Sequence, residues 1–347
     1  MFNDLLGNSE IKTALIRMLE TKAIANSLLF AGTEGIGKGL FALKLAENLL
    51  GRPNHPDLHI LHPEGKMGLH SIQALRRLNE EVYMAPFEGQ WKVFIIHDAE
   101  RMLPASSNAL LKTFEEPAKD TLIILLSSKP TALLPTVLSR CRKLYFRPLD
   151  EGDISTYLQS KHGMGFDEAR RTAYLAQGSL GKALRLMQGA SDKGRTLLLQ
   201  QLAQGKIRNY KALTELVEAL AAEVEGSKQV LEEELAAFTV TDGLTAPQKE
   251  ALQKELDGAL TMRLMQEGEN LFQACIEWFR DLQLLSVNGN RTFLIHRDYE
   301  NELEQAFHRG EMHPVEKVEK AVGEARLALE RSSGFSFAME SLLLNIC

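Results

Sequence analysis

The sequence contains few cysteines and no long apolar run, and both absences exclude classes of protein. Its three cysteines, Cys141, Cys275 and Cys347, lie far apart among 347 residues. That spacing offers neither a disulfide framework nor a zinc cluster. No apolar run approaches the ~20 residues that span a membrane, and the N-terminal segment around Asp4 and Glu10 has no apolar core of signal-peptide length. We therefore expect a cytoplasmic protein without membrane contact.

The sequence also lacks a large excess of either charge. The net charge is −6, with 44% hydrophobic and 25% charged residues, which is an ordinary globular composition. A protein held on nucleic acid by bulk charge alone would be basic, so that class is excluded, whereas a local basic surface is not. A chain of this length has room for about two or three domains.

What the sequence does contain is a glycine-rich segment at residues 32–39 that nearly fits the phosphate-binding loop G-x-x-x-x-G-K-[ST]. In a complete loop, backbone N–H groups surround the phosphates, the lysine reaches the β and γ oxygens, and the final hydroxyl holds Mg²⁺. Here Gly39 occupies the hydroxyl position and has no side chain to bind a metal. The residues that remain available to hold a nucleotide are Gly32, Gly35, Gly37 and Lys38.

The segments on either side of this loop favour a nucleotide site over a chance match. The apolar run Ser27–Ala31 predicts a short buried strand, and the apolar residues between positions 40 and 50 have helical spacing. A strand, a glycine loop and a helix in this order direct a helix N-terminus at phosphate. The alternative is a glycine-rich turn that carries a surface lysine.

A second candidate position is Asp98, which follows the apolar run at residues 93–96. A P-loop ATPase needs an Asp near the metal, and usually a Glu directly after it to activate the attacking water. Asp98 can fill the first role, whereas Ala99 cannot fill the second and Glu100 would project differently. The alternative is that Asp98 is only a polar residue at the end of a strand.

Strand-like and helix-like segments alternate up to about residue 148. Continuous apolar strands that alternate with helices indicate a parallel sheet with both faces covered. We expect strands at residues 27–31, 58–61, 91–96, 121–126 and 143–146, and helices that include residues 71–83 and 106–115.

After Pro148 the strand patterns stop and helical patterns continue to the end of the chain. One short helix is expected from an N-cap at Asp167 to about Gly178. Thr245 and Gln248 have the spacing of a capping box at the start of a later helix. We therefore expect an α/β P-loop domain at residues 1–148, a small helical lid at residues 149–188 and an all-α domain at residues 189–347.

Three segments carry motifs that are specific to one family. Residues 87–102 contain a central strand and its acidic end, residues 107–117 read Ser-Asn-Ala-Leu-Leu-Lys-Thr-Phe-Glu-Glu-Pro, and residues 134–141 end in Ser-Arg-Cys. These segments resemble the subunits of bacterial clamp loaders, which are AAA+ proteins. The resemblance runs nearly the full length, since residues 277–282 and 339–344 are similar to the collar domain of that family. It implies an AAA+ sheet domain, a helical lid and a C-terminal collar that joins subunits.

The resemblance assigns a role to Arg140, the centre of the Ser-Arg-Cys motif. In the family this arginine acts in trans, because it reaches across a subunit boundary into a neighbour's ATP site. Such an arginine finger stabilises charge on the transferring phosphoryl group and is worth about 10³–10⁵ in rate. Guanidinium suits this role because it is planar, always charged and offers forked donors. The alternative is that Arg140 is a surface arginine that caps a helix end.

The resemblance also identifies a position where the chain departs from ATP-hydrolysing relatives. Those relatives place a lid arginine over the γ-phosphate within the segment matched by residues 177–183, and here Gly181 occupies that position. The adjacent Lys182 is one residue out of register, so we expect it to be a solvated lysine. Together with Gly39 and Ala99, Gly181 predicts a subunit that donates to a neighbour's site and does not hydrolyse ATP itself.

Subunits of this type usually carry a four-cysteine zinc module after the P-loop helix, and this chain does not. Residues 51–57 are few and contain no cysteine, and His55, His59 and His62 lack thiolate partners and helical metal spacing. We therefore expect no zinc and no required cofactor. The sequence leaves open whether the loop still holds ATP or ADP without hydrolysis.

These observations predict a hetero-oligomeric clamp-loader subunit that acts in DNA replication. The resemblance implies partners of the gamma/tau and delta types and, through the complex, the sliding clamp and primed DNA. One alternative is an ATP-hydrolysing motor subunit of the gamma/tau type, and another is an unrelated P-loop kinase or helicase. The missing hydroxyl at residue 39 counts against both alternatives.

Apolar residues of the C-terminal region suggest where subunits meet. A monomer rarely exposes large apolar patches, so we expect part of this surface at interfaces, with packing inside the domain as the alternative. The residues concerned are Leu271, Phe272, Ile276 and Phe279.

Overall fold

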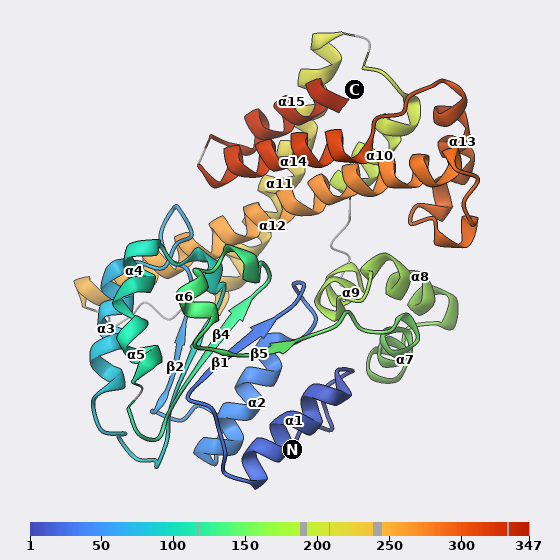
Figure 1. The fold of residues 1–347 in the computed structure, drawn as a ribbon. Coiled ribbons are helices and arrows are strands. Elements are labelled where there is room, and N and C mark those ends of the chain that lie inside the picture. Colours follow the sequence, from blue (N-terminus) through green and yellow to red (C-terminus); the bar gives the residue numbers. More distant parts are fainter. Residues whose placement is uncertain (117, 188–192, 208, 239–244, 332, 347) are drawn as a thin grey trace. The chain divides into compact units, whose positions relative to one another are not determined.

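The computed structural model of the protein describes residues 1–116, 118–187, 193–207, 209–238, 245–331 and 333–346. The chain divides into two compact units, Met1–Ala190 and Ser191–Cys347, which are considered separately (Figure 1). The expected lid at residues 149–188 lies within the first unit, and its standing as a separate domain stays a prediction. None of the described helices is both long and apolar enough to cross a membrane.

The first unit is built on a five-stranded parallel sheet with strand order β2-β3-β4-β1-β5 (Figure 1). The strands are β1 (Ser27–Ala31), β2 (Leu58–Leu61), β3 (Lys92–Ile96), β4 (Thr121–Ser127) and β5 (Arg142–Tyr145). In the register, Phe30 of β1 lies between Leu126 of β4 and Leu144 of β5. The predicted α/β P-loop sheet is therefore confirmed. Because all strands are parallel, the loops that follow β1, β3 and β4 meet at one edge.

Helices cover both faces of this sheet (Figure 1). Successive side chains of a strand point to opposite faces, so Phe30 packs into the core with α1 and α2, whereas Leu29 packs into the core with α3, α5 and α6. This arrangement explains why the strands are continuous apolar runs. The helices are α1 (Ser9–Glu20), α2 (Lys38–Leu50), α3 (Ile72–Val82), α4 (Pro104–Ala109), α5 (Leu111–Glu115) and α6 (Pro135–Leu138).

Two helix predictions in the first unit were wrong in detail. The helix expected over residues 106–115 is divided into α4 and α5 at Leu110, whose side chain is fully buried in the core and whose N–H bonds to Ser107. The helix expected to start at Asp167 starts at Phe166 after Gly165 as N-cap. Asp167 instead lies in the first turn, where its negative charge interacts favourably with the helix dipole.

Three helices complete the first unit and share a small core of their own. They are α7 (Glu151–His162), α8 (Phe166–Ala176) and α9 (Leu180–Met187). Ile154, Leu158 and Ala173 are among its buried residues. The end of α8 carries Gln177 in a left-handed conformation followed by Gly178, as expected for a helix terminus near Gly178.

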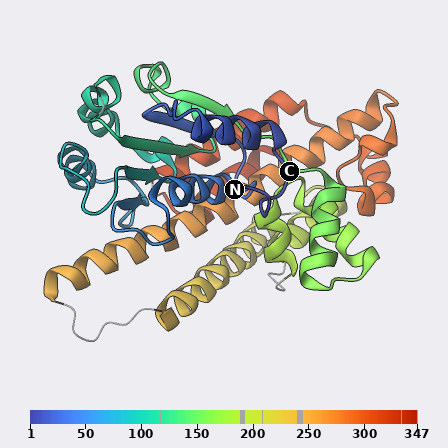
Figure 2. The ribbon, with the colours of Figure 1, turned by 90° about the horizontal axis from the view of Figure 1, so that it is seen from below.

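The described part of the second unit is helical. Its helices are α10 (Lys193–Gln204), α11 (Tyr210–Phe238), α12 (Ala246–Ser286), α13 (Glu300–His308), α14 (Val315–Glu330) and α15 (Phe335–Ile346). Figure 2 shows the long helices α11 and α12 side by side, in agreement with their contacts. The predicted capping box at the start of α12 is confirmed, because the backbone N–H of Thr245 donates to Gln248 Oε1 over 2.9 Å and the reciprocal bond is also present.

The residues expected at subunit interfaces lie instead in the core of the second unit. Leu271, Phe272 and Phe279 are buried, and the half-buried Ile276 packs against the same core. Their helix is in contact with neighbours on several sides, so its apolar positions are used within the domain. The exposed apolar side chains of this unit lie elsewhere and include Phe337 and Leu344 on α15.

Four buried charged or titratable side chains link elements of the second unit. Arg195 Nη2 on α10 donates to Glu277 Oε2 over 2.8 Å and lies 2.9 Å from His296 Nε2. His296 Nδ1 lies 3.0 Å from Asp281 Oδ2, which also accepts from the backbone N–H of His296 and Ile295. The network therefore joins the start of α10, the C-terminal part of α12 and the segment before α13.

Candidate functional site

The glycine-rich loop lies between the end of β1 and the start of α2. Gly35 and Gly37 have φ angles of 74° and 98°, a region that favours glycine because a Cβ atom would be strained there. The backbone N–H of Gly32 donates to the carbonyl of Ser127 at the end of β4 over 3.1 Å. The loop is therefore held at the carboxyl edge of the sheet with the N-terminus of α2 beside it.

Lys38 is directed toward its own loop. Its Nζ donates to the carbonyl oxygens of Gly32 at 2.6 Å and Thr33 at 2.8 Å, and the side chain is buried. Burial lowers the pKa of Lys38, opposed by the negative charges of Glu34, Glu100 and Asp98. The structure thus brings Lys38 and Gly32 together as predicted, but with the ammonium group bonded to backbone oxygens.

Asp98 follows β3 in a left-handed conformation, with φ 47° and ψ 52°. Burial, helped by the charges of Glu100 and Glu34, raises the pKa of the Asp98 carboxyl to about 7. A carboxyl group that is partly protonated near neutral pH is a weaker ligand for a cation than an ordinary aspartate.

The carboxylate of Glu100 is bonded to the segment that follows β4. Its Oε1 accepts from the N–H and hydroxyl of Ser128, at 3.0 and 2.7 Å, and from the N–H of Lys129 at 3.2 Å. Although burial raises the pKa of Glu100, these bonds from Ser128 bring it below its ordinary value. Glu100 therefore caps the loop after β4, a role that the sequence did not indicate.

Residue 39 provides no oxygen ligand for a metal. A Cβ atom at Gly39 would lie 3.4 Å from His97 Cε1 and 3.8 Å from Leu126 Cδ1, which is ordinary packing distance. His97 stacks on His62 with ring centroids 4.2 Å apart, so an imidazole pair borders this position. The donor set of loop, lysine and Asp98 does not fit the oxygen coordination that Mg²⁺ requires.

Gly181 lies directly on the glycine-rich loop. Its backbone N–H donates to the carbonyl of Gly35 over 2.9 Å, and a Cβ atom at Gly181 would lie 3.1 Å from Gly35 Cα. An arginine at this position would require the loop or the start of α9 to move. The glycine thus permits a close approach between α9 and the loop.

Arg140 lies on the surface just after α6, and its side chain is 31% exposed. Its Nη1 donates to the carbonyl of Thr136 in α6 over 2.8 Å. This is the contact expected under the alternative that Arg140 is a surface arginine that caps a helix end. Its Nη2 is paired with the carboxylate of Glu115 at the end of α5. The sequence singled out Arg140 but not Glu115, which no pattern marks beyond its place in the segment 107–117.

The histidines near the loop are part of the fold. His55 is buried beside Asp57, and His59 lies in β2 with its ring stacked on Phe94 at 4.8 Å. Across the described ranges, no three His, Cys, Asp or Glu side chains are grouped so that they could hold a metal ion.

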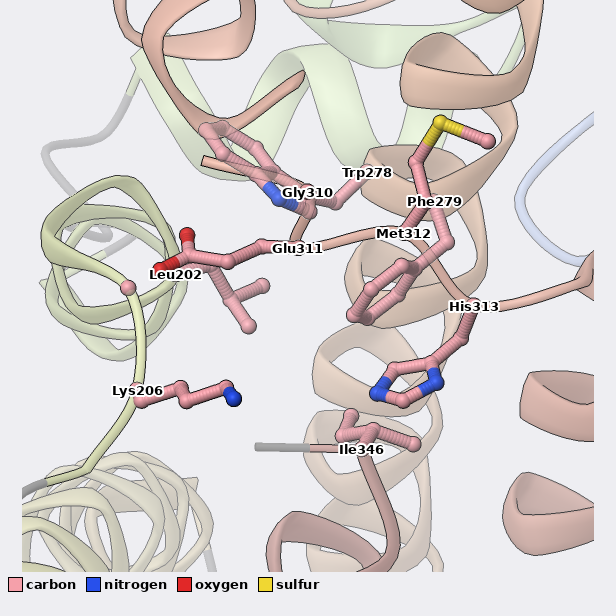
Figure 3. Close-up of a pocket in the computed structure, with 10 residues that line it drawn as sticks. Leu202, Lys206, Trp278, Phe279, Gly310, Glu311, Met312, His313 and Ile346 are labelled. Atoms are coloured by element: carbon pink, nitrogen blue, oxygen red, sulfur yellow. The ribbon is translucent and has the colours of Figure 1, made fainter. Parts of the chain in front are cut away.

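A small pocket of about 130 Å³ lies in the second unit (Figure 3). Its floor is apolar, with Trp278, Phe279 and Ile346, while Lys206 and Glu311 lie at its sides. Glu311 is paired with Arg309 at 2.9 Å.

Comparison with known proteins relates this chain to replication proteins. A family model described as DNA polymerase III, delta subunit, matches residues 50–150. The chain is 34% identical over 162 residues to the delta′ subunit of DNA polymerase III from Bacillus subtilis, a match that covers 42% of this chain and 49% of the relative. It is 37% identical over 149 residues to the delta′ subunit from Escherichia coli, covering 43% and 45%.

The tau subunit of DNA polymerase III from Escherichia coli is 29% identical over 246 residues, covering 63% of this chain and 38% of the relative. The chain thus spans about half the length of the two delta′ relatives. Identity is higher with the delta′ subunits than with tau. In the part of the chain that these matches cover, the protein is similar to the delta′ subunits of DNA polymerase III.

Proposed function

We propose that this protein is a delta′-like subunit of a bacterial clamp loader that does not hydrolyse ATP itself. The observation that carries the proposal is the set of residues and contacts around its glycine loop. Lys38 is bonded to two carbonyls of the loop, and Gly181 lies against Gly35. Residue 39 offers no metal ligand, and Ala99, at the position of the base, is fully buried. No cofactor is then required, and any ATP or ADP held by the loop would be bound without hydrolysis.

Arg140 would serve a neighbouring subunit rather than this one. It lies on the surface outside the loop's own contacts and carries a guanidinium group suited to phosphoryl oxygens. The neighbour would be a gamma/tau-type motor subunit, with a delta-type subunit in the same hetero-oligomer. Acting together in the cytoplasm, they would open a sliding clamp and place it on primed DNA. The exposed Phe337 and Leu344 of α15 are candidates for contacts between collars.

The test is hydrolysis of ATP with and without the partners. The isolated chain should show no more turnover than its Lys38→Ala variant. In the reconstituted complex, Arg140→Ala should leave assembly intact but reduce turnover at the adjacent site by on the order of 10³. The total hydrolysis rate of the complex should therefore fall by the contribution of that one site. Arg140→Lys should recover little, because an ammonium group lacks the planar fork.

The alternative is an ATP-hydrolysing subunit of the gamma/tau type, favoured by the longer match to tau. A lysine-dependent turnover of about 1 s⁻¹ or more by the isolated chain would support that alternative and overturn the proposal. Unchanged hydrolysis by an intact Arg140→Ala complex would remove Arg140 from the mechanism.

A further inference from the structure

Arg140 is held against its own subunit by several acceptors. Nη2 is paired with Glu115 Oε1, and Nη1 donates to the carbonyl of Thr136 at 2.8 Å and to Ser139 Oγ at 3.3 Å. The Nε atom is buried, and no hydrogen-bond partner for it is present in the part of the chain that the structure describes. The guanidinium group is therefore folded back onto the ends of α5 and α6.

This conformation leaves little of the guanidinium for a neighbour. Of its five N–H donors, three are used by Glu115, Thr136 and Ser139, and the one on Nε is buried. One N–H on Nη2 then remains to reach an outside anion, and the carboxylate of Glu115 offsets the positive charge of Arg140. An arginine that stabilises phosphoryl oxygens uses two parallel donors and an unneutralised charge. The finger must leave Glu115 before it can act.

We propose that Glu115 is the counterion that retains Arg140 on its own subunit, and that the phosphates of a nucleotide in the neighbouring site replace it. This inference rests on the proposed function. Glu115 is then a positioning residue, since it touches neither nucleotide nor metal and acts only through Arg140.

The strength of the contact suits an exchange of partners. Both side chains are partly exposed, 31% for Arg140 and 47% for Glu115. Exposed pairs of this kind bias an equilibrium by up to about fivefold. A polyphosphate offers several charged oxygens and forms stronger, bidentate bonds with guanidinium. The nucleotide can therefore displace Glu115. The strength of the pair with Glu115 sets how readily Arg140 is released.

Glu116 provides a matched control on the same turn. It is an exposed glutamate directly after Glu115, and it is bonded through its backbone: its N–H donates to the carbonyl of Lys112 at 2.8 Å, and its carbonyl accepts from Tyr83 Oη at 3.5 Å. Glu116→Gln removes the same charge as Glu115→Gln without touching Arg140. The two variants therefore separate the ion pair from the general charge of this surface.

The experiment uses the complex reconstituted from the full chain and its ring partners, with ATP titrated in steady-state hydrolysis. We expect Glu115→Gln to raise kcat/KM by about two- to fivefold, because the finger is no longer retained. Glu116→Gln should match the wild type. In the Arg140→Ala background, Glu115→Gln should change nothing, since Glu115 acts through Arg140. Size-exclusion chromatography and thermal melting confirm that each variant assembles and folds.

The outcomes are distinguishable. If Glu115→Gln leaves kcat/KM unchanged or lowers it, or if its effect persists without Arg140, the inference is overturned while the proposed function stands. If Arg140→Ala alone leaves hydrolysis unchanged in the assembled complex, Arg140 is removed from the mechanism and this inference fails with it, whereas the proposal of a non-hydrolysing subunit is overturned only by lysine-dependent turnover of the isolated chain.

Discussion

The charged side chains buried in the second unit and those beside the glycine loop of the first unit differ in how they are paired. Arg195 bonds to Glu277, and His296 bonds to Asp281, with separations of 2.8 and 3.0 Å. Beside the loop, Lys38 bonds to backbone carbonyls. No ion pair to the Asp98 carboxylate is found within the described ranges.

The groups beside the loop have shifted pKa values. Burial raises the pKa of Asp98 to about 7 and lowers that of Lys38, so both charges beside the loop are held at a cost. Shifts of this kind are common at functional sites, because binding geometry takes precedence over stability there. The network of the second unit has the character of a structural link between helices. The comparison teaches that buried charge alone does not identify a site: the second unit pairs its buried charges with one another, whereas Lys38 beside the loop is bonded to backbone carbonyls.

The largest effect should follow the loss of Arg195. Arg195→Ala leaves Glu277 buried without its cation, which should lower the free energy of unfolding by about 3–5 kcal/mol. Urea unfolding of the full chain measures this, followed by the fluorescence of Trp278 in the same unit after Trp91 of the first unit is replaced by Phe in both proteins. Lys211→Ala serves as control, since its pair with Glu215 is exposed and the change should stay within about 0.5 kcal/mol. If Arg195→Ala changed the free energy of unfolding as little as Lys211→Ala, the network of the second unit would not be a structural link and the comparison with the loop would fail.

The next effect depends on pH and concerns Asp98. Its pKa in the folded chain, about 7, is above the ordinary value of 3.8, so folding favours the protonated carboxyl. The resulting stability is fully present below pH 3.8 and is lost as pH rises to 7. Asp98→Asn removes this titration and keeps a residue that tolerates the left-handed conformation. The variant should gain roughly 2–4 kcal/mol over the wild type between pH 4 and pH 8.

The check is a series of denaturant unfolding curves for both proteins over that pH range. If the stabilities of the two proteins changed in parallel with pH, the charge of the Asp98 carboxylate would be balanced in the folded chain. The charges beside the loop would then not differ from those of the second unit's network.

The smallest effect should follow the removal of the loop ammonium group. Lys38→Met loses the bonds to Gly32 and Thr33 but also removes a charge from a buried position. Because these terms oppose each other, the free energy of unfolding should change by less than about 1 kcal/mol. Thermal and urea unfolding of Lys38→Met and Arg195→Ala, measured side by side, would sharpen the contrast between the loop and the second unit's network. A loss as large as that of Arg195→Ala would mean that the loop depends on Lys38 for its structure.

The sheet and the loop could be predicted from local patterns, and distant contacts could not. The run Leu28–Phe30 marked β1 because a strand buried on both faces must be apolar throughout. The capping box at Thr245 was predictable because its partners are three residues apart. The interface role expected for Phe272 was wrong because helical spacing reveals an apolar face but not what covers it.

The sequence by itself determined the parallel sheet, the glycine loop and the vacancies at residues 39, 99 and 181, because these depend on residue type and short spacing. Only the tertiary structure decided that Gly181 lies on Gly35, that Lys38 is bonded to its own loop, and that Glu115 holds Arg140. Each of these contacts depends on where the folded chain brings an atom to within a few ångströms of another. Electrostatics follows from such distances and from burial, and neither is present in an unfolded sequence.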